Sequence, residues 1–317
     1  MRYLVTGGSG FIGSHLTEAL VSEGSIVKIL DNFGSGNRDN LSKVLDKIEL
    51  INGDIRNEEL VDQLVSNSDV VFHLAASLGV HNILESPIES ISVNIYGSEK
   101  VLQSAARHKK RIIIASTSEI YGKNNQQPLS EDSDRLIGRP QNYRWAYSDS
   151  KAIEEAMAAY LFQAQDLQVT TVRLFNTVGP RQNNLFGMVL PTFIEKALKG
   201  EDLIVYGDGM QTRTFCHVTD VVNALIQISK NDKTIGEVFN IGGEGEISIL
   251  ELARKVVLRT NSKSKIVFKS YQDAYPKGFE DMFRRVPDLQ KIRNILGWSP
   301  AYNLDQIISD TSESIKI

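Results

Sequence analysis

The sequence has very little cysteine. Cys216 is its single cysteine, so no internal disulfide can form, and the Cys-x-x-Cys or Cys/His spacing of a zinc site is absent. A basic face or stripe of the kind that duplex-binding proteins show is also missing, since the formal net charge is −4 without long charged blocks. We therefore expect no metal site and no nucleic-acid partner.

Long apolar runs are missing as well. No stretch is long enough to cross a bilayer, and Met1 and Arg2 run directly into the first expected strand without a leader segment. With the lone cysteine, these absences predict a cytoplasmic protein without a membrane partner. The remaining composition, 41% hydrophobic and 23% charged over 317 residues, is ordinary for a globular chain with a sizeable core and room for two domains.

Short apolar runs alternate with segments of helical periodicity in the first half of the chain. Several of these runs are almost continuously apolar, which is typical of strands covered on both faces. The alternation predicts an α/β fold with a doubly wound parallel sheet, known as a Rossmann fold. The expected strands are 2–6, 26–30, 48–51, 70–74, 111–115 and 169–174.

The pattern changes after residue 175, because glycine and proline become frequent in 176–187. A helix over 191–199, a short strand over 203–206 and a helix near 220–229 are expected next. We therefore expect a first domain over 1–175, with later strand contributions from about 214–242, and a smaller interleaved C-terminal domain over most of 176–317.

A glycine-rich turn follows the first expected strand and opens the first helix. Gly7, Gly10 and Gly13 recur at every third position. Glycine permits the tight turn, the close approach of a pyrophosphate and close helix–strand packing, and the free N–H groups at the helix start attract the diphosphate. Asp31 ends the second strand, where a carboxylate can bond the adenosine ribose and repel a 2′-phosphate. The first domain is therefore predicted to bind NAD rather than NADP.

Tyr147 and Lys151 stand four residues apart in a segment with helical periodicity, so their side chains share one face. The ammonium group favours the phenolate and is expected to lower the pKa of Tyr147, which could then act as a base. The same spacing also occurs by chance in many helices. Two other features make a catalytic role for this Tyr–Lys pair more credible here. They are the glycine turn and the polar run 116–119, which follows an apolar strand at the edge of the sheet where ligands bind. Together they predict an enzyme that oxidises a hydroxyl group.

Several motifs resemble those of the extended short-chain dehydrogenase/reductases, and among them the nucleotide-sugar epimerases, dehydratases and decarboxylases. The resemblance runs from the first strand to about residue 300, and it implies a Rossmann fold, NAD as cofactor and a UDP-sugar as substrate. The motifs are TGGSGFIG (6–13), DNFGSG (31–36), GDIR (53–56), HLAA (73–76), STSEIYG (116–122), YSDSK (147–151), RLFNTVGPRQ (173–182), YGDGMQTR (206–213) and LGWSP (296–300).

The resemblance also implies roles for individual residues. Tyr147 would be the base, Lys151 would hold the nicotinamide ribose and Asp31 would hold the adenosine ribose. The catalytic set would be Thr117, Ser118, Glu119, Tyr147 and Lys151. The cofactor would be bound by Gly7, Gly10, Phe11, Ile12, Gly13, Asp31, Asn32, Phe33, Gly36, Asp54, Ile55, Leu74, Ala75, Ala76, Asn94, Tyr147 and Lys151. The substrate would be bound by Asn176, Val189, Leu190, Tyr206, Arg213 and Arg285.

Three reactions in this group share one first step, the oxidation of the sugar at C4. The leading expectation is a UDP-sugar 4-epimerase, and the alternative is a UDP-glucuronate decarboxylase. Ser118–Glu119 stands where glucose-type 4,6-dehydratases carry an Asp–Glu pair, so a dehydratase is less expected. A protein that keeps NAD but has lost catalysis would be expected to lack Tyr147 or Lys151, and both are present.

The role of the late basic residues stays open at this point. Arg285, in RRVPD (284–288), matches an arginine of a decarboxylase motif, but it could instead bind the diphosphate. A second diphosphate ligand could be Lys277, Arg284 or Arg285, and lysine is the poorer bidentate partner. The side chains that choose the sugar are expected in 78–82 and 141–145.

The resemblance also implies a homodimer, formed through a four-helix bundle by helices near 92–107 and 147–165. Ala152, Ala156 and Ala159 would allow close packing between helices, although the same alanines could pack on the sheet.

Overall fold

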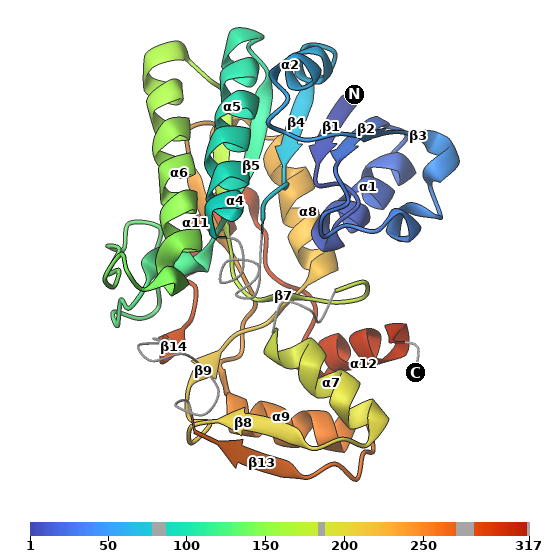
Figure 1. The fold of residues 1–317 in the computed structure, drawn as a ribbon, viewed down its shortest axis with the longest axis vertical. Coiled ribbons are helices and arrows are strands. Elements are labelled where there is room, and N and C mark those ends of the chain that lie inside the picture. The colour runs from blue at the N-terminus through green and yellow to red at the C-terminus, as the bar shows by residue number, and fades with distance from the viewer. Residues whose placement is uncertain (78–86, 183–187, 271–281, 316–317) are drawn as a thin grey trace.

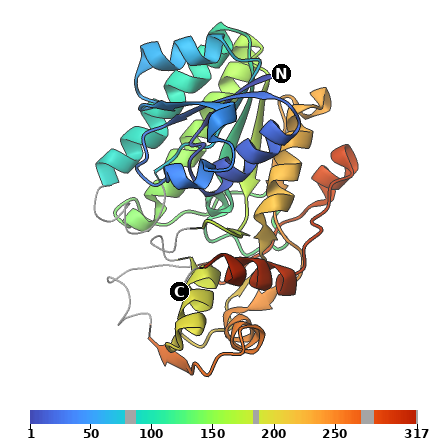
Figure 2. The same cartoon turned by 90° about the vertical axis from the view of Figure 1, so that its right-hand side faces the viewer.

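The computed structural model describes residues 1–77, 87–182, 188–270 and 282–315. Figures 1 and 2 show two lobes, with a large sheet and its helices above and a smaller group of helices and short strands below. The N-terminus lies in the upper lobe and the C-terminus at the lower lobe.

A seven-stranded sheet forms the centre of the upper lobe, in the order β3-β2-β1-β4-β5-β6-β11. Every neighbouring pair is parallel, as the alternating sequence pattern predicted. The strands are β1 (Arg2–Thr6), β2 (Ile26–Asp31), β3 (Ile48–Asn52), β4 (Val70–His73), β5 (Arg111–Thr117), β6 (Val169–Leu174) and β11 (Val238–Ile241).

Helices cover both faces of this sheet, which explains why its strands are apolar at successive positions. In β5, Ile113 packs into the core on one face, while Ile112 and Ile114 pack into the core on the other. The first face is covered by α1 (Phe11–Ser22) and α8 (Val218–Ser229). The second face is covered by α2 (Glu58–Ser66), α5 (Ser98–Arg107) and α6 (Ala146–Gln165).

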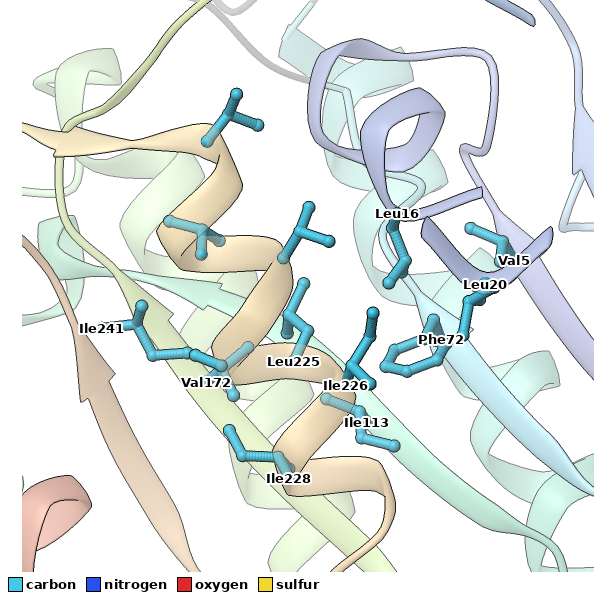
Figure 3. Close-up of a cluster of buried hydrophobic side chains, with 14 of the residues drawn as sticks. Val5, Leu16, Leu20, Phe72, Ile113, Val172, Leu225, Ile226, Ile228 and Ile241 are labelled. Carbon is cyan, nitrogen blue, oxygen red and sulfur yellow. The ribbon is translucent and has the colours of Figure 1, made fainter. Parts of the chain in front are cut away.

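Figure 3 shows how α8 closes the first face. Leu225, Ile226 and Ile228 from the helix lie among strand side chains such as Ile113 and Val172. All five side chains are fully or almost fully removed from solvent, so each contributes its full apolar area to stability.

The lower lobe has its own core, formed where three helices pack on a pair of parallel strands. A three-stranded group with β9 at its centre, and a short pair between the lobes, complete this part. The elements are β7 (Thr177–Val178), α7 (Val189–Lys199), β8 (Leu203–Tyr206), β9 (Thr212–Arg213), β10 (Cys216–His217), β12 (Ile247–Ser248), α9 (Ile249–Arg259), β13 (Ile266–Lys269), β14 (Arg284–Arg285) and α12 (Leu304–Ser314).

The chain passes between the lobes several times. After the first visit to the lower lobe it returns to the sheet with α8 and β11, then forms β12 to β14 below. It returns once more with α11 (Gln290–Leu296), which packs on β11, and ends below with α12. The late strand expected within 214–242 is thus β11, while β10 pairs with β7 outside the large sheet.

The structure confirms most of the predicted elements, and some of their boundaries differ from the predicted ones. The expected strands begin at the predicted residues, and α7 begins at Val189, so that Pro191 lies in its first turn, where a missing N–H costs little. The helix expected over 92–107 is divided into α4 (Pro87–Ser92), a π-helical turn η3 (Val93–Gly97) and α5. The turn brings Gly97 so close to Ile55 that an added Cβ would lie 2.4 Å from its Cδ1.

The described residues include no helix that combines the length and hydrophobicity needed to span a membrane.

Replacing a core isoleucine of β5 should lower the free energy of unfolding strongly. We expect Ile113→Ala to cost about 2–5 kcal/mol, because the side chain is fully buried between α8 and the sheet. Ile26→Ala is the matched control, since Ile26 begins β2 with 61% of its surface exposed and should cost less than about 1 kcal/mol. Chemical denaturation of both variants would contradict this account if their midpoints moved equally.

Candidate active site

The candidate site lies at the carboxyl edge of the large sheet, which faces the lower lobe (Figure 1). Because the strands are parallel, their carboxyl ends meet at this one edge, where open α/β sheets bind ligands. The register places Thr6 beside Leu30 and His73. The glycine turn follows β1, Asp31 is the last residue of β2 and the polar run 116–119 begins at the end of β5, so all three lie at this edge.

The glycine turn is packed so closely that side chains would not fit. Gly7 has φ +72°, and an added Cβ would lie 2.8 Å from the Ala75 Cα, while a Cβ on Gly13 would lie 2.2 Å from the Gly7 oxygen. Gly10 precedes α1 without a side-chain cap, and the first turn of α1 carries no acidic residue. Its first N–H groups are therefore suited to a diphosphate.

Asp31 holds this turn in place. Its two carboxylate oxygens accept hydrogen bonds from the Ser9 N–H at 2.9 Å and the Phe33 N–H at 2.8 Å. A cavity of about 410 Å³ opens beside it. Its lining residues are Phe33, Gly36, Asn37, Arg38, Leu50 and Asn52. This cavity and the uncapped start of α1 fit the adenosine and diphosphate of NAD.

Sequence reasoning named Phe33 and Gly36 in this cavity and missed its other lining residues. Asn37 and Arg38 stand just beyond the DNFGSG motif, and their position gave a usable signal. Leu50 and Asn52 come from β3 and reach the cavity through strand pairing alone, which the sequence does not show.

Other predicted cofactor residues have structural partners within the protein. Asp54 forms an ion pair with Arg56 at 2.6 Å. Asn94 is buried and accepts a hydrogen bond from the Ser77 N–H at 2.8 Å. The remaining positions line the same edge, where Asn32 accepts the Gly34 N–H at 3.0 Å. The core on the α1 and α8 face of the sheet partly buries Phe11, Ile12 and Leu74, and the core on the opposite face partly buries Ala75. Ala76 is partly exposed. Ile55 is buried and contacts Gly97.

Tyr147 and Lys151 lie in the first turns of α6, as their spacing predicted, and Tyr147 shares a side-chain hydrogen bond with Thr117 at the end of β5. The expected lowering of the Tyr147 pKa is wrong. Burial raises the pKa of Tyr147, and the charges of Glu154 and Glu119 add to the rise, while the Thr117 hydrogen bond opposes it.

Glu119 is clamped by two arginines. It forms an ion pair with Arg144 at 2.5 Å and a second with Arg285, which in turn donates a hydrogen bond to the Asn176 Oδ1 at 2.7 Å. Burial alone would raise the pKa of Glu119, but the two guanidinium groups outweigh it and lower the pKa to about 2. Glu119 is therefore a carboxylate at neutral pH. Its neighbour Ser118 is buried at the start of the same 3₁₀ turn.

Arg144 lies within the range 141–145 in which side chains that choose the sugar were expected, but sequence reasoning did not name it as a site residue. It stands three residues before Tyr147, but no motif marks it. The other expected range, 78–82, lies outside the described residues.

The structure separates two of the three basic candidates, Arg284 and Arg285. Arg285 lies in the site, whereas Arg284 is exposed and pairs with Glu246 at 2.6 Å. Lys277 lies outside the described residues. Arg213 is buried on β9, directly opposite Arg285 on β14, so the two predicted substrate arginines are brought together.

The remaining predicted substrate residues lie in the lower lobe. Tyr206 ends β8, and Val189 and Leu190 begin α7. The Leu190 side chain is fully buried in the core of the lobe, so only its backbone is placed to meet a ligand. Within the described ranges, no group of three or more His, Cys, Asp or Glu side chains could hold a metal ion.

Comparisons with known proteins agree with this architecture. The family model described as GDP-mannose 4,6 dehydratase matches residues 4–311. The chain is 44% identical over 311 residues to UDP-N-acetyl-alpha-D-glucosaminuronate decarboxylase of Bacillus cytotoxicus, covering 98% of this chain and 96% of that protein. It is 35% identical to UDP-glucuronic acid decarboxylase 1 of Danio rerio, covering 98% and 71%.

Among solved structures, the UDP-glucose 4-epimerase of Thermus thermophilus in complex with NAD matches with a TM-score of 0.85 and 27% identity, over 99% of this chain and 98% of that one. The chain therefore belongs to the GDP-mannose 4,6-dehydratase family, within the extended short-chain dehydrogenase/reductases that modify nucleotide sugars.

Proposed function

We propose that the chain is an NAD-dependent decarboxylase of a UDP-linked uronic acid. The observation that carries this proposal is the pairing of one carboxylate, Glu119, with two guanidinium groups, those of Arg144 and Arg285. The cluster keeps one excess positive charge at the end of β5, next to Thr117 and its partner Tyr147. A uronic acid carries a carboxylate at C6 that this charge would attract, whereas UDP-glucose has a neutral hydroxyl there.

The relatives support the decarboxylase over the leading expectation of a 4-epimerase. The two named relatives, at 44% and 35% identity, are decarboxylases of UDP-uronic acids, while the epimerase structure stands at 27%. The more similar relative acts on an N-acetylated uronate by its name, which makes UDP-N-acetylglucosaminuronate the first substrate to test.

The chemistry follows from these groups. Tyr147, once deprotonated, would take the proton of the C4 hydroxyl, with Thr117 orienting it and Lys151 on the same helix face. The cofactor, when bound, would supply a hydride acceptor for C4 in its oxidised form and a hydride donor in its reduced form. A ketone at C4 is β to the C6 carboxylate, so the C5–C6 bond can break, its electron pair passing into the C4 enolate as CO₂ leaves. A proton then replaces CO₂ at C5.

Glu119 would act in this reaction as a fixed anion. With a pKa of about 2 it holds no proton to donate at neutral pH. Its contribution is to hold Arg144 and Arg285 where the substrate carboxylate can reach them.

We expect the protein, supplied with NAD⁺, to release CO₂ from UDP-N-acetylglucosaminuronate or UDP-glucuronate and to form the corresponding UDP-pentose, which keeps the acetamido group at C2 in the first case. Incubation with these two compounds, and separately with UDP-glucose and UDP-N-acetylglucosamine, can be followed by NMR. Interconversion of the neutral sugars without any release of CO₂ would refute the decarboxylase and restore the epimerase.

Because Glu119 pairs with Arg285 and not with Arg284, substitutions of these two adjacent arginines should change kcat/KM to very different extents. Arg285→Lys should lower kcat/KM roughly 10- to 100-fold, because lysine cannot reproduce the hydrogen bonds to Glu119 and Asn176. Arg144→Lys should act in the same direction. Arg284→Lys is the matched control and should change kcat/KM less than about twofold, since Arg284 pairs with Glu246 at the surface. Equal losses in Arg284→Lys and Arg285→Lys would contradict a specific role for the clamp.

A homodimer is part of this proposal. Large apolar side chains are exposed on α4, η3 and α6: Ile88 (82%), Tyr96 (59%), Ile153 (44%) and Tyr160 (64%). Ala156 and Ala159 are exposed on α6, so they do not pack on the sheet. Exposed apolar side chains on neighbouring helices, as on α4, η3 and α6, are typical of an interface between subunits.

Light scattering coupled to size exclusion should therefore give the mass of a dimer. Tyr160→Glu should shift the protein toward the monomer, because it would bury a charge in the interface. Leu258→Glu, on α9 of the lower lobe with Leu258 77% exposed, should leave the dimer intact. A monomeric native protein would refute this part of the proposal.

A further inference from the structure

A second buried carboxylate, Glu154, lies beside Lys151. Its Oε2 is 2.7 Å from the Lys151 Nζ, and the two side chains are 1% and 2% exposed. The residues are three positions apart on α6, so the helix itself holds them together. A buried ion pair stabilises a fold only weakly, because both charges lose their hydration. Stability alone is therefore a poor reason for a carboxylate at this position.

Lys151 is the charged partner of Glu154, and the Ser98 side chain on α5 adds a hydrogen bond to the same carboxylate. His73 on β4 places its Nε2 3.9 Å from the Glu154 Oε1, but burial and the Lys151 charge lower the pKa of His73 to about 3, so the ring is neutral. That nitrogen also hydrogen-bonds Ser98 on α5 at 2.9 Å. On α6 itself, Glu155 pairs with Arg173 at 2.8 Å.

The charge of Glu154 acts on two neighbours, Lys151 and Tyr147. Burial raises the pKa of Glu154, and the Lys151 ammonium opposes that rise through the ion pair. Glu154 in turn is the charge that contributes most to the raised pKa of Tyr147, ahead of Glu119, whose own charge is offset by Arg144 and Arg285. A lysine engaged in this way stabilises the phenolate of Tyr147 less than a lysine without a carboxylate beside it.

We propose that Glu154 is a positioning residue that holds Lys151 and offsets its charge, and thereby sets the pH range in which Tyr147 can act as a base. This inference rests on the proposed catalytic role of Tyr147. The same negative charge favours a cationic ligand at the site, so it should also favour oxidised nicotinamide over the neutral reduced form.

The test compares the native protein with Glu154→Gln, which removes the charge and keeps the shape. Removing a negative charge favours the phenolate, so the acidic limb of the kcat/KM profile for the UDP-uronate should move to lower pH by about one unit. The affinity for NADH relative to NAD⁺ should rise about tenfold, as measured by calorimetry. The affinity ratio needs no turnover, so it tests Glu154 even if the proposed reaction fails.

Two further variants make the result specific. Glu155→Gln removes the same charge one residue away and should shift both readouts much less than Glu154→Gln, because that carboxylate pairs with Arg173 and does not add to the raised pKa of Tyr147. Glu154→Asp withdraws the carboxylate by one methylene and should give smaller shifts in the same direction, which keeps the test available if the Gln variant does not fold. Unchanged readouts in both Glu154 variants, or equal shifts in Glu155→Gln, would overturn the proposal.

Discussion

The ion pair between Glu119 and Arg285 connects the two halves of the molecule where the site is formed. Glu119 follows β5 in the upper lobe, while Arg285 lies on β14 in the lower lobe. Asn176 continues the connection, because its Nδ2 donates to the Thr214 carbonyl at 2.8 Å. One of the contacts between the lobes therefore also sets the charge of the site. A substrate that binds to Arg285 must therefore share its guanidinium group with Glu119, which already forms an ion pair with it.

The site contains two buried carboxylates, Glu119 and Glu154, and their charges are compensated in different ways. Glu119 receives two cations from separate elements and stays ionised with an excess of positive charge around it. Glu154 pairs with one cation on its own helix, Lys151, and its charge adds to the raised pKa of Tyr147. The first arrangement suits the binding of an anion, and the second makes the phenolate of Tyr147 less favourable.

Much of the fold could be predicted from the sequence, because hydrophobic periodicity and glycine spacing are local signals. The strands of the first half and the Gly7–Gly13 turn were recognised in this way. The charge environment could not be predicted, since it depends on contacts between distant segments. The motif already favoured Arg285 over Arg284, but the ion pairs that separate them, with Glu119 for Arg285 and with Glu246 for Arg284, could not be predicted. The raised pKa of Tyr147 depends on burial and on Glu154, which no spacing rule marked.

The repeated passage of the chain between the lobes limits how such an enzyme can change its substrate. A cut after β6 would remove α8 and β11 from the sheet, and a cut before α11 would remove the helix that packs on β11. Neither lobe is therefore a portable module that recombination could exchange in one piece. New specificity in this architecture must come from substitutions and loop changes made in place, such as those around Arg144 and β14.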